Sequence, residues 1–249
     1  MMKVVAIVLA LTAPLVQSDL VLSKSVMHKT LVAAELSDLA YAVTAPNDTE
    51  TMDYTAFGYY KEEPDQALTA KTKDGYCYVA FRGTSLTWDD WKQNLEIGNQ
   101  DICVDVAGTQ KCCTSRIGFF QAYNTTYRYD VEQAVRDCAK TCVDKDECVV
   151  ITGHSQGGAI AAVAALYLVD LNPYVITFGQ PPTIEAPCDL IPSARMYRFV
   201  NTKETTTLGI SYDPVSNTRE RLAVTDEQSQ IFSYRLPCRQ VSALIILEI

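Results

Sequence analysis

The sequence predicts an α/β fold, with a mostly parallel central sheet and helices on both faces. Residues 148–152 and 174–178 are short, almost continuous apolar runs, and an alanine-rich helical stretch at residues 159–171 separates them. Strands that are apolar throughout are typical of parallel sheets buried on both faces. A strand, a helix and a second strand in close succession predict a right-handed crossover. The composition agrees, because 48% of the 249 residues are hydrophobic, enough to form a sizeable core.

The remaining elements follow from local patterns along the chain. Helical spacing of apolar residues marks two further helices, and runs of β-forming residues mark three further strands. No internal repeat, linker or low-complexity segment interrupts the chain, so we expect one domain over residues 19–249. The expected helices span residues 31–41 and 129–142, and the expected strands span residues 76–81, 102–106 and 196–200.

The first eighteen residues predict a secretory signal peptide. Lys3 gives a basic start, residues 4–11 form an unbroken apolar run, and the small residue Ser18 precedes the expected cleavage point. This run is too short to span a bilayer but has the length of a signal-peptide core. We therefore expect a secreted, extracellular protein whose mature chain has no transmembrane segment.

Nine cysteines and two N-glycosylation sequons agree with secretion. An oxidising compartment allows most of the cysteines to pair, and the odd count leaves at least one thiol free or bound to another chain. Their spacing leaves the connectivity open, and it does not indicate a zinc site because nearby histidines and CxxC pairs are missing. The sequons begin at Asn47 and Asn124. The cysteines are Cys77, Cys103, Cys112, Cys113, Cys138, Cys142, Cys148, Cys188 and Cys238.

The charge balance argues against nucleic acid as a partner. Acidic residues outnumber basic ones 30 to 21, for a net charge of −9, and the summed field repels phosphate backbones. No ligand cluster for calcium or another metal is evident in the sequence, so no metal and no cofactor are expected.

The sequence Gly153-His154-Ser155-Gln156-Gly157 is the centre of the functional interpretation. A GxSxG pattern by itself is weak, but this one lies directly between an expected strand and an expected helix, as a nucleophile elbow requires. The flanking glycines avoid collisions with neighbouring backbone. The N-terminus of the following helix directs free N–H groups and a positive dipole at an oxyanion.

Four segments around this pentapeptide resemble the fungal-type class 3 lipase family. They are TGHSQGGA at 152–159, AFRGT at 80–84, TFGQP at 177–181 and the segment 117–123. The similarity extends over about residues 31–215, with the strongest motifs in family order. It implies an α/β-hydrolase fold and hydrolysis of triacylglycerols or other carboxylic esters through an acyl-serine intermediate. A lipid or small ester is then the substrate, with transient contact to a lipid interface.

The resemblance also implies roles for individual residues. Ser155 matches the nucleophile, and His154 matches the elbow histidine, which is structural. Thr84 matches the oxyanion-hole residue, which offers its backbone N–H and hydroxyl to the acyl oxygen. The backbone N–H of Gln156, the residue after the nucleophile, is the second donor.

Residues 85–93 fall where these lipases carry a lid. Trp88 and Trp91 lie in this segment and are candidates for lipid contact, with ordinary packing as the alternative. Asp89 and Asp90 make the segment more polar than an efficient interfacial lid. This favours short or soluble esters as substrates.

Two carboxylates compete for the acid of the catalytic triad. Glu204 follows the arginine strand at a separation that the family often shows. Asp213, in Asp-Pro-Val, resembles the family's acid tripeptide, with residues 204–212 as an insertion. We favour Asp213, with Glu204 as the alternative.

The general base of the triad is missing from the sequence. The family's base is a histidine downstream of the acid, but this chain has only His28 and His154. Gln240 stands near the position of the base, and an amide cannot accept the serine proton. Loss of the triad histidine costs a serine hydrolase about 10⁶-fold in rate, and oxyanion stabilisation and binding leave about 10³–10⁴ over water.

Three interpretations therefore remain open. The chain is a lipase-type ester hydrolase, or it is a noncatalytic relative that binds an acyl ligand or a protein in the former cleft. The third interpretation is a truncated or mis-joined copy of an active lipase. It arises because residues 216–249 are atypical of the family and carry a charged run at 218–230.

Overall fold

The structure is a computed structural model of the chain. It describes residues 9–10, 22–42, 44–47, 51–62, 65–83, 98–185, 188–201, 221–225 and 230–231. Outside the main body, β1 (Leu9–Ala10) and β11 (Gln230–Ile231) form a short antiparallel pair.

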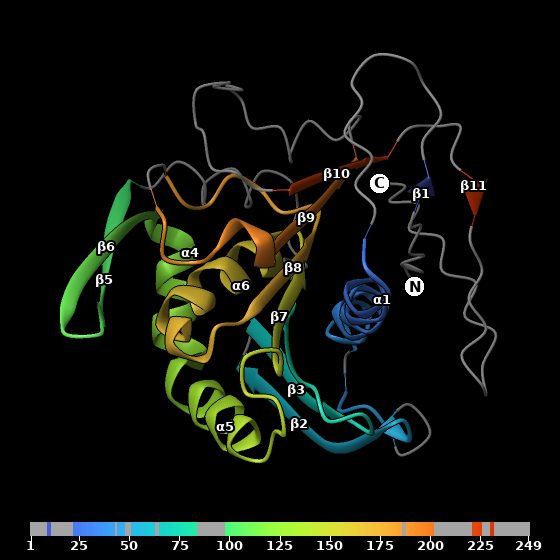
Figure 1. The fold of residues 1–249 in the computed structure, drawn as a ribbon. Coiled ribbons are helices and arrows are strands. Elements are labelled where there is room, and N and C mark those ends of the chain that lie inside the picture. The colour runs from blue at the N-terminus through green and yellow to red at the C-terminus, as the bar shows by residue number, and fades with distance from the viewer. Residues whose placement is uncertain are drawn as a thin grey trace.

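A seven-stranded sheet forms the centre of the molecule, in the order β10-β9-β8-β7-β4-β3-β2 (Figure 1). The strands from β4 to β10 run parallel, and β3 and β2 add an antiparallel edge. The mostly parallel sheet predicted from the sequence is thus confirmed. The bounds are β2 Tyr54–Glu62, β3 Asp65–Thr72, β4 Cys77–Phe81, β7 Val149–His154, β8 Tyr174–Phe178, β9 Met196–Asn201 and β10 Arg221–Thr225.

Helices cover both faces of this sheet, as expected. The helix α1 lies on one face, while α4, α5 and α6 lie on the other (Figure 1). The helices are α1 Lys24–Leu39, α4 Ile117–Gln121, α5 Arg128–Lys140 and α6 Gln156–Tyr167, with a π-helix at Ala122–Tyr127 and 3₁₀ turns at Val169–Leu171 and Ser193–Arg195.

Alternating side chains of the central strands fill two separate cores. In β4, Val79 and Phe81 join the core under α4, α5 and α6, whereas Tyr78 and Ala80 join the core under α1. Successive strand residues point to opposite faces of a sheet, so a strand covered on both sides must be apolar throughout. This is why β4, β7 and β8 are buried along their whole length.

A buried lysine holds α1 on the sheet. Lys29 is completely buried, and its ammonium donates to Ser25 Oγ at 2.7 Å and to Glu147 at 3.3 Å. The same ammonium lies 4.3 Å and 4.8 Å from the ring centroids of Tyr76 and Tyr174. A buried charge is tolerated only when it is paired, and these contacts satisfy Lys29 with one group of α1 itself and groups from three other segments of the chain.

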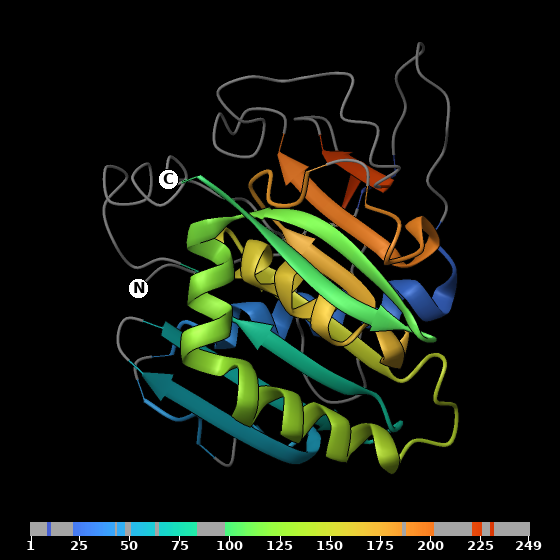
Figure 2. The same cartoon turned by 90° about the vertical axis from the view of Figure 1, so that its left-hand side faces the viewer.

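A two-stranded hairpin forms an outer layer over the α4 and α6 side. It consists of β5 (Asn99–Val106) and β6 (Thr109–Arg116), and it crosses α6 in the view of Figure 2. Cys103–Cys112 joins the two strands, and Cys113–Cys188 ties the hairpin to the body. Because an isolated hairpin is marginal in water, these disulfides explain how it persists at the edge of the fold. The strand expected at 102–106 is therefore present, but outside the central sheet.

Candidate active site

Ser155 occupies a sharp turn between β7 and α6. Its backbone dihedral angles are φ 57° and ψ −126°, and its N–H donates to the Phe178 carbonyl at 2.8 Å. A positive φ at a non-glycine residue costs about 1–3 kcal/mol and persists only where the surroundings enforce it. The side chain is half-buried, so it remains accessible. The expected strand, turn and helix are all present, and α6 begins directly after the serine, earlier than the sequence indicated.

Two glycines allow the turn to close. A Cβ at Gly153 would collide with the Gly157 carbonyl and lie 2.8 Å from the Gly158 nitrogen. A Cβ at Gly157 would collide with the Phe81 carbonyl oxygen and lie 2.7 Å from the Arg82 carbonyl carbon. The glycines predicted from the motif are therefore required by two close backbone contacts, one with the first turn of α6 and one with the end of β4.

The end of β4 reaches the elbow directly. A Cβ on Gly83 would lie 2.6 Å from the carbonyl oxygen of His154, the residue before the nucleophile. Thr84, for which we expect an oxyanion-hole role, follows Gly83 but lies outside the described residues. Gln156 is the first residue of α6 and half-buried, and N–H groups in the first turn of a helix have no acceptor within the helix. Two of the expected oxyanion segments thus converge on Ser155, up to the residue before Thr84.

The environment of the His154 imidazole does not suit a general base. The side chain is buried and its Nδ1 lies 2.8 Å from the hydroxyl of Tyr41, at the end of α1. Burial lowers the pKa of His154 to about 4, and burial raises the pKa of Tyr41 above its ordinary range. We assign the Tyr41 hydroxyl as the donor to a neutral His154, so Nδ1 is already occupied.

Tyr41 also contacts the oxyanion segment. The backbone N–H of Gly83 donates to its hydroxyl, which therefore joins Gly83 to His154, one residue before Thr84 and one before Ser155. Tyr41, which its contacts place beside the candidate site, was not predicted from the sequence. Its only signal is a tyrosine at the end of the first helix, and the pairing depends on tertiary structure.

Lowering the pH is expected to destabilise the protein through His154. An imidazole in the unfolded chain titrates at about pH 6.5, whereas the pKa of His154 in the folded protein is about 4, so the unfolded state binds the extra proton between these values. The stability linked to the neutral imidazole is complete above about pH 6.5 and is lost as the pH falls to about 4. The shift corresponds to a loss of about 3 kcal/mol in the free energy of unfolding.

Urea unfolding at pH 7 and pH 4 measures this loss. The control is His154→Asn, whose side-chain oxygen accepts from the Tyr41 hydroxyl without titrating. An equal loss of stability in the variant and the wild type would contradict the assignment.

His28 lies at the opposite end of the sheet from Ser155. Its Nε2 is 3.0 Å from a carboxylate oxygen of Asp74, in the turn before β4, whereas Ser155 follows the end of β7. The helix expected at residues 31–41, which would leave His28 before its start, begins earlier, at Lys24. The Ser23 hydroxyl accepts from the Val26 N–H and caps α1 at Lys24, so His28 lies within the helix. Neither histidine of the chain is thus placed to activate the nucleophile.

A buried polar cluster supports the strand that leads toward the expected acid. Gln180 accepts from the Thr177 hydroxyl at 2.6 Å and donates to Thr183 at 3.2 Å. Its carbonyl accepts two bonds from the Arg198 guanidinium, from Nε at 3.0 Å and from Nη2. This cluster fixes β9 beside the first turn of α6, where the Gln180 Cβ lies near Gly158.

Several predicted site residues lie outside the described residues. These are both acid candidates, Asp213 and Glu204, both lid tryptophans, Trp88 and Trp91, and the oxyanion residue Thr84. Their assignments remain predictions from the family resemblance.

Eight cysteines form four disulfides, as expected for most of the nine, and Cys238 lies outside the described residues. Among the residues that the structure describes, one group of three potential metal ligands lies close together, namely Cys77, Cys142 and Cys148. All three belong to disulfides, so they present no thiolate to a metal ion in this state.

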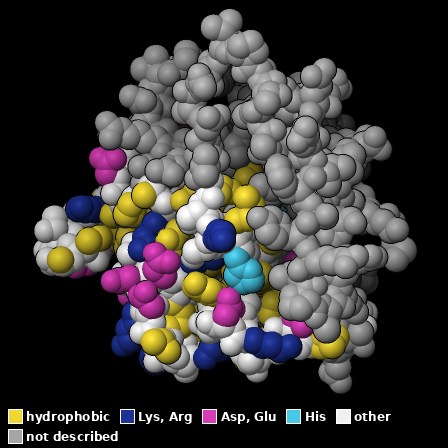
Figure 3. Space-filling view, turned by 45° about the vertical axis from the view of Figure 1, so that its right-hand side comes forward, with side chains coloured by type: hydrophobic (Ala, Val, Ile, Leu, Met, Phe, Trp, Pro, Cys, Tyr) yellow, Lys and Arg dark blue, Asp and Glu magenta, His cyan; other side chains and the backbone are white. Residues whose placement is uncertain are grey.

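The two sequons occupy different environments. Asn47 is exposed, in the segment after α1, while Asn124 is half-buried in the π-helix and its Oδ1 accepts from Arg128 at 3.0 Å. A glycan needs open space around the asparagine, so the exposed Asn47 is the more accessible of the two. No helix in the described parts of the chain is long and apolar enough to span a membrane. The face in Figure 3 shows acidic and basic side chains interspersed over the described part of the molecule.

Comparison with known proteins agrees with this geometry. The model of the family "Lipase (class 3)" matches residues 78–205, just over half of the chain. A secreted mono- and diacylglycerol lipase of Fusarium solani is 39% identical over 105 residues, which are 41% of this chain and 29% of that protein. The match thus spans less than a third of the relative.

Solved lipases share the fold. The Lip2 lipase of Yarrowia lipolytica superposes with a TM-score of 0.55 at 17% identity, covering 77% of this chain and 76% of that one. The mono- and diacylglycerol lipase of Aspergillus oryzae gives a TM-score of 0.53 at 18% identity, covering 76% and 75%. These likenesses show the α/β-hydrolase fold.

Proposed function

We propose that this chain, which belongs to the class 3 lipase family, hydrolyses carboxylic esters of the acylglycerol type through an acyl-Ser155 intermediate. The observation that carries the proposal is the backbone of Ser155, which has φ 57° in the turn between β7 and α6. Gly83 packs against the carbonyl of His154, the residue before this serine. Strain at one accessible serine is a feature that a nucleophile requires and a packing residue does not.

The proposed reaction uses the groups that converge on this turn. The Ser155 hydroxyl oxygen attacks the ester carbonyl, and the resulting oxyanion accepts hydrogen bonds from Gln156 N–H and from Thr84. The serine proton passes to solvent water, and the C–O bond to the alcohol breaks as the alcohol oxygen takes up a proton from water. A second water molecule then attacks the acyl-serine, which releases the acid and restores the serine hydroxyl. Asp213, with Glu204 as the alternative, is the acid that the family resemblance assigns.

Turnover is slow because no imidazole takes the serine proton. The His154 imidazole is hydrogen-bonded to the Tyr41 hydroxyl, and His28 lies in α1 beside Asp74, at the opposite end of the sheet from Ser155. Loss of the base costs about 10⁶-fold in a complete triad, while the oxyanion donors retain part of the rate enhancement.

The same observation favours a second candidate function. With the His154 imidazole bonded to Tyr41, the fold retains the turn at Ser155 without efficient chemistry, as a noncatalytic binder of acyl ligands would. Glycines fitted to the elbow and to β4 disfavour this alternative, since binding alone does not require a strained serine.

Secretion is part of the proposal. Four disulfides support an oxidising compartment, and the Fusarium solani relative is described as secreted. Residues 1–18 are the proposed signal peptide, residues 19–249 the proposed single domain, and Asn47 the preferred glycosylation site. Mono- and diacylglycerols, triacylglycerols and short soluble esters are the proposed substrates, with Trp88 and Trp91 as contacts to a lipid interface.

Added imidazole is expected to accelerate ester hydrolysis by the wild-type protein. A free imidazole can take the proton that no side chain accepts, so the hydrolysis rate of p-nitrophenyl butyrate should rise by about tenfold or more, in proportion to imidazole concentration. Because imidazole hydrolyses this ester unaided, the rate of Ser155→Ala at each concentration is subtracted. Emulsified tributyrin and triolein then compare short and long acyl chains.

Each other outcome rejects one part of the proposal. Equal rates for the wild type and Ser155→Ala at every imidazole concentration would leave the noncatalytic binder. A fast wild-type rate that ignores imidazole would show that another group acts as the base.

A further inference from the structure

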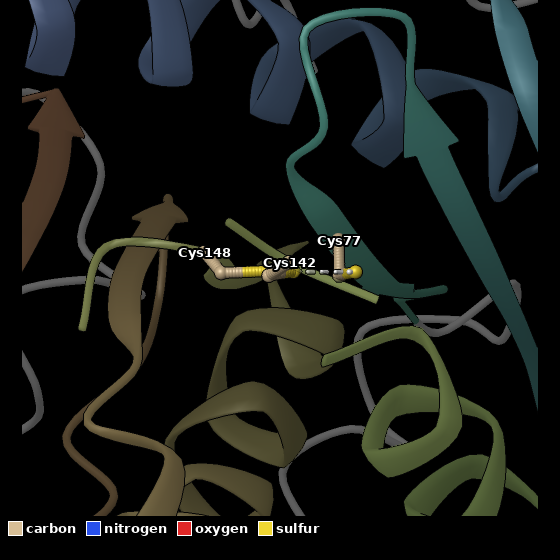
Figure 4. A group of neighbouring side chains, drawn as sticks. All are labelled: Cys77, Cys142 and Cys148. Carbon is tan, nitrogen blue, oxygen red and sulfur yellow. Dashed lines mark hydrogen bonds between the residues drawn. A yellow bond between two sulfur atoms is a disulfide. The ribbon is translucent and has the colours of Figure 1, made fainter. Parts of the chain in front are cut away.

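Four cysteines converge at the end of the sheet opposite Ser155. Cys77 is the first residue of β4, and Cys148 directly precedes β7. Cys138 and Cys142 lie in and just beyond the last turn of α5. Figure 4 shows the side chains of Cys77, Cys142 and Cys148 meeting between the two strands and the helix.

The two disulfides of this cluster touch each other. Cys77 pairs with Cys138 and Cys142 pairs with Cys148, yet the Sγ atoms of Cys77 and Cys142 are only 3.6 Å apart. The sulfur atoms of Cys77, Cys142 and Cys148 all lie within 4.8 Å of one another. A disulfide rearranges when a thiolate attacks one of its sulfur atoms, and here the sulfur of the second pair is already in contact with the first.

The other two disulfides lack this arrangement. Cys112 and Cys113 are consecutive residues of β6, so their side chains point to opposite faces of the hairpin. Cys112 faces Cys103 across the hairpin, whereas Cys113 reaches Cys188 in the body and is buried. These pairs provide an internal comparison.

We propose that Cys77, Cys138, Cys142 and Cys148 form a thiol–disulfide exchange site that responds to thiol reductants. A dithiol reductant first gives two electrons and two protons to Cys142–Cys148. The Cys142 thiolate then attacks Cys77 Sγ, the Cys77–Cys142 bond forms, and the Cys77–Cys138 bond breaks. Cys138 leaves as a thiolate and takes up a proton, so this second step is redox-neutral.

The surface location of the loop between Cys142 and Cys148 makes it the entry point. The residues between them are exposed or half-buried, and Val143 is fully exposed. Thiol reagents reach exposed disulfides more readily than buried ones. Cys77 is buried, and Cys142 and Cys138 are both half-buried, so it is the exposed loop next to Cys142 that favours entry at Cys142–Cys148.

Exchange would move the attachment point of the Cys77 disulfide from Cys138 to Cys142, four residues or about one helical turn further along the chain. β4 would be tied to Cys142 in place of Cys138, and the loop before β7 would lose its clamp. Ser155 follows Cys148 by seven residues along β7, which is about 23 Å at about 3.3 Å for each residue. The inference is therefore independent of the proposed function, and its readout is the disulfide map.

Cys148→Ser tests the proposal without added reductant, because it leaves Cys142 as a free thiol. Trypsin places Cys77, Cys138 and Cys142 on three different peptides, at residues 74–82, 137–140 and 141–145. After alkylation of the folded variant at pH 8, we expect a linked pair of the first and third peptides and alkylation on Cys138. Alkylation on Cys142 alone, with Cys77 joined only to Cys138, would overturn the proposal.

Cys188→Ser is the matched control. It leaves Cys113 free on the other face of the hairpin, so alkylation should stay on Cys113 and Cys103–Cys112 should remain intact. If Cys148→Ser does not fold, the wild type is treated with limiting dithiothreitol, alkylated and mapped in the same way. Appearance of Cys77–Cys142 supports the exchange, and simple loss of Cys142–Cys148 with Cys77–Cys138 unchanged rejects it.

Discussion

Replacing Ser155 by alanine is expected to abolish labelling by a fluorophosphonate probe and to remove the protein-dependent part of ester hydrolysis. The probe reacts with a serine oxygen that a turn presents beside oxyanion donors, and Ser155 has that backbone geometry, with the N-terminus of α6 immediately after it. The wild type should label slowly, over hours, because no imidazole withdraws the proton. Gel fluorescence against time measures the labelling of the variant and of the wild type.

The matched control for this prediction is Ser193→Ala. Ser193 lies in the 3₁₀ turn just before β9, whereas Ser155 follows the end of β7, which runs in the same direction, so the two serines lie at opposite ends of the sheet. Its labelling should equal that of the wild type. Undiminished labelling of Ser155→Ala would contradict the role of the elbow, and rapid labelling of the wild type would contradict the absence of a base.

Replacing Gly157 by alanine is expected to have the largest effect on stability. The new methyl group would collide with the carbonyl oxygen of Phe81 and lie 2.7 Å from the Arg82 carbonyl carbon. Overpacking typically costs about 1–3 kcal/mol, and the obstacle here is the backbone of a buried strand rather than a flexible side chain. We expect a loss of about 3 kcal/mol or more in the free energy of unfolding, measured by urea unfolding with the disulfides intact.

Gly108→Ala controls for the substitution itself. Gly108 has φ +80° in the turn of the β5–β6 hairpin, and a Cβ there would meet no atom within 4 Å. Its cost should be the backbone penalty alone, about 1–2 kcal/mol. If Gly157→Ala costs no more than Gly108→Ala, α6 does not press against β4 as described.

The centre of the fold was predictable because its strands obey a strong local rule. β4, β7 and β8 are mostly apolar and are buried along their whole length, as strands of a sheet covered on both faces are. The antiparallel strands β2 and β3 were not predicted. β2 combines aromatic residues with lysine and glutamate, and β3 combines alanine, leucine and threonine with aspartate, glutamine and lysine. Their hydrophobic periodicity is therefore weak, and their pairing depends on their position at the edge of the sheet.

Of the site, the sequence predicted the parts that a contiguous motif encodes. The strained turn at Ser155 and its two glycines follow from GxSxG between a strand and a helix. Tyr41 could not be predicted, because its contacts with His154 and Gly83 join segments far apart in the chain. The pairing of the cysteines was inaccessible for the same reason, since spacing alone does not determine which sulfur atoms meet.

The most direct test of the central claim is the position of the phosphonyl adduct in the wild-type protein. After labelling with the fluorophosphonate in the presence of imidazole, the protein is reduced, alkylated and digested with trypsin, and the peptide of residues 146–195 is fragmented. We predict a single adduct, on the oxygen of Ser155. An adduct on any other residue, or none after prolonged incubation with imidazole, would contradict the claim that this strained serine is the nucleophile.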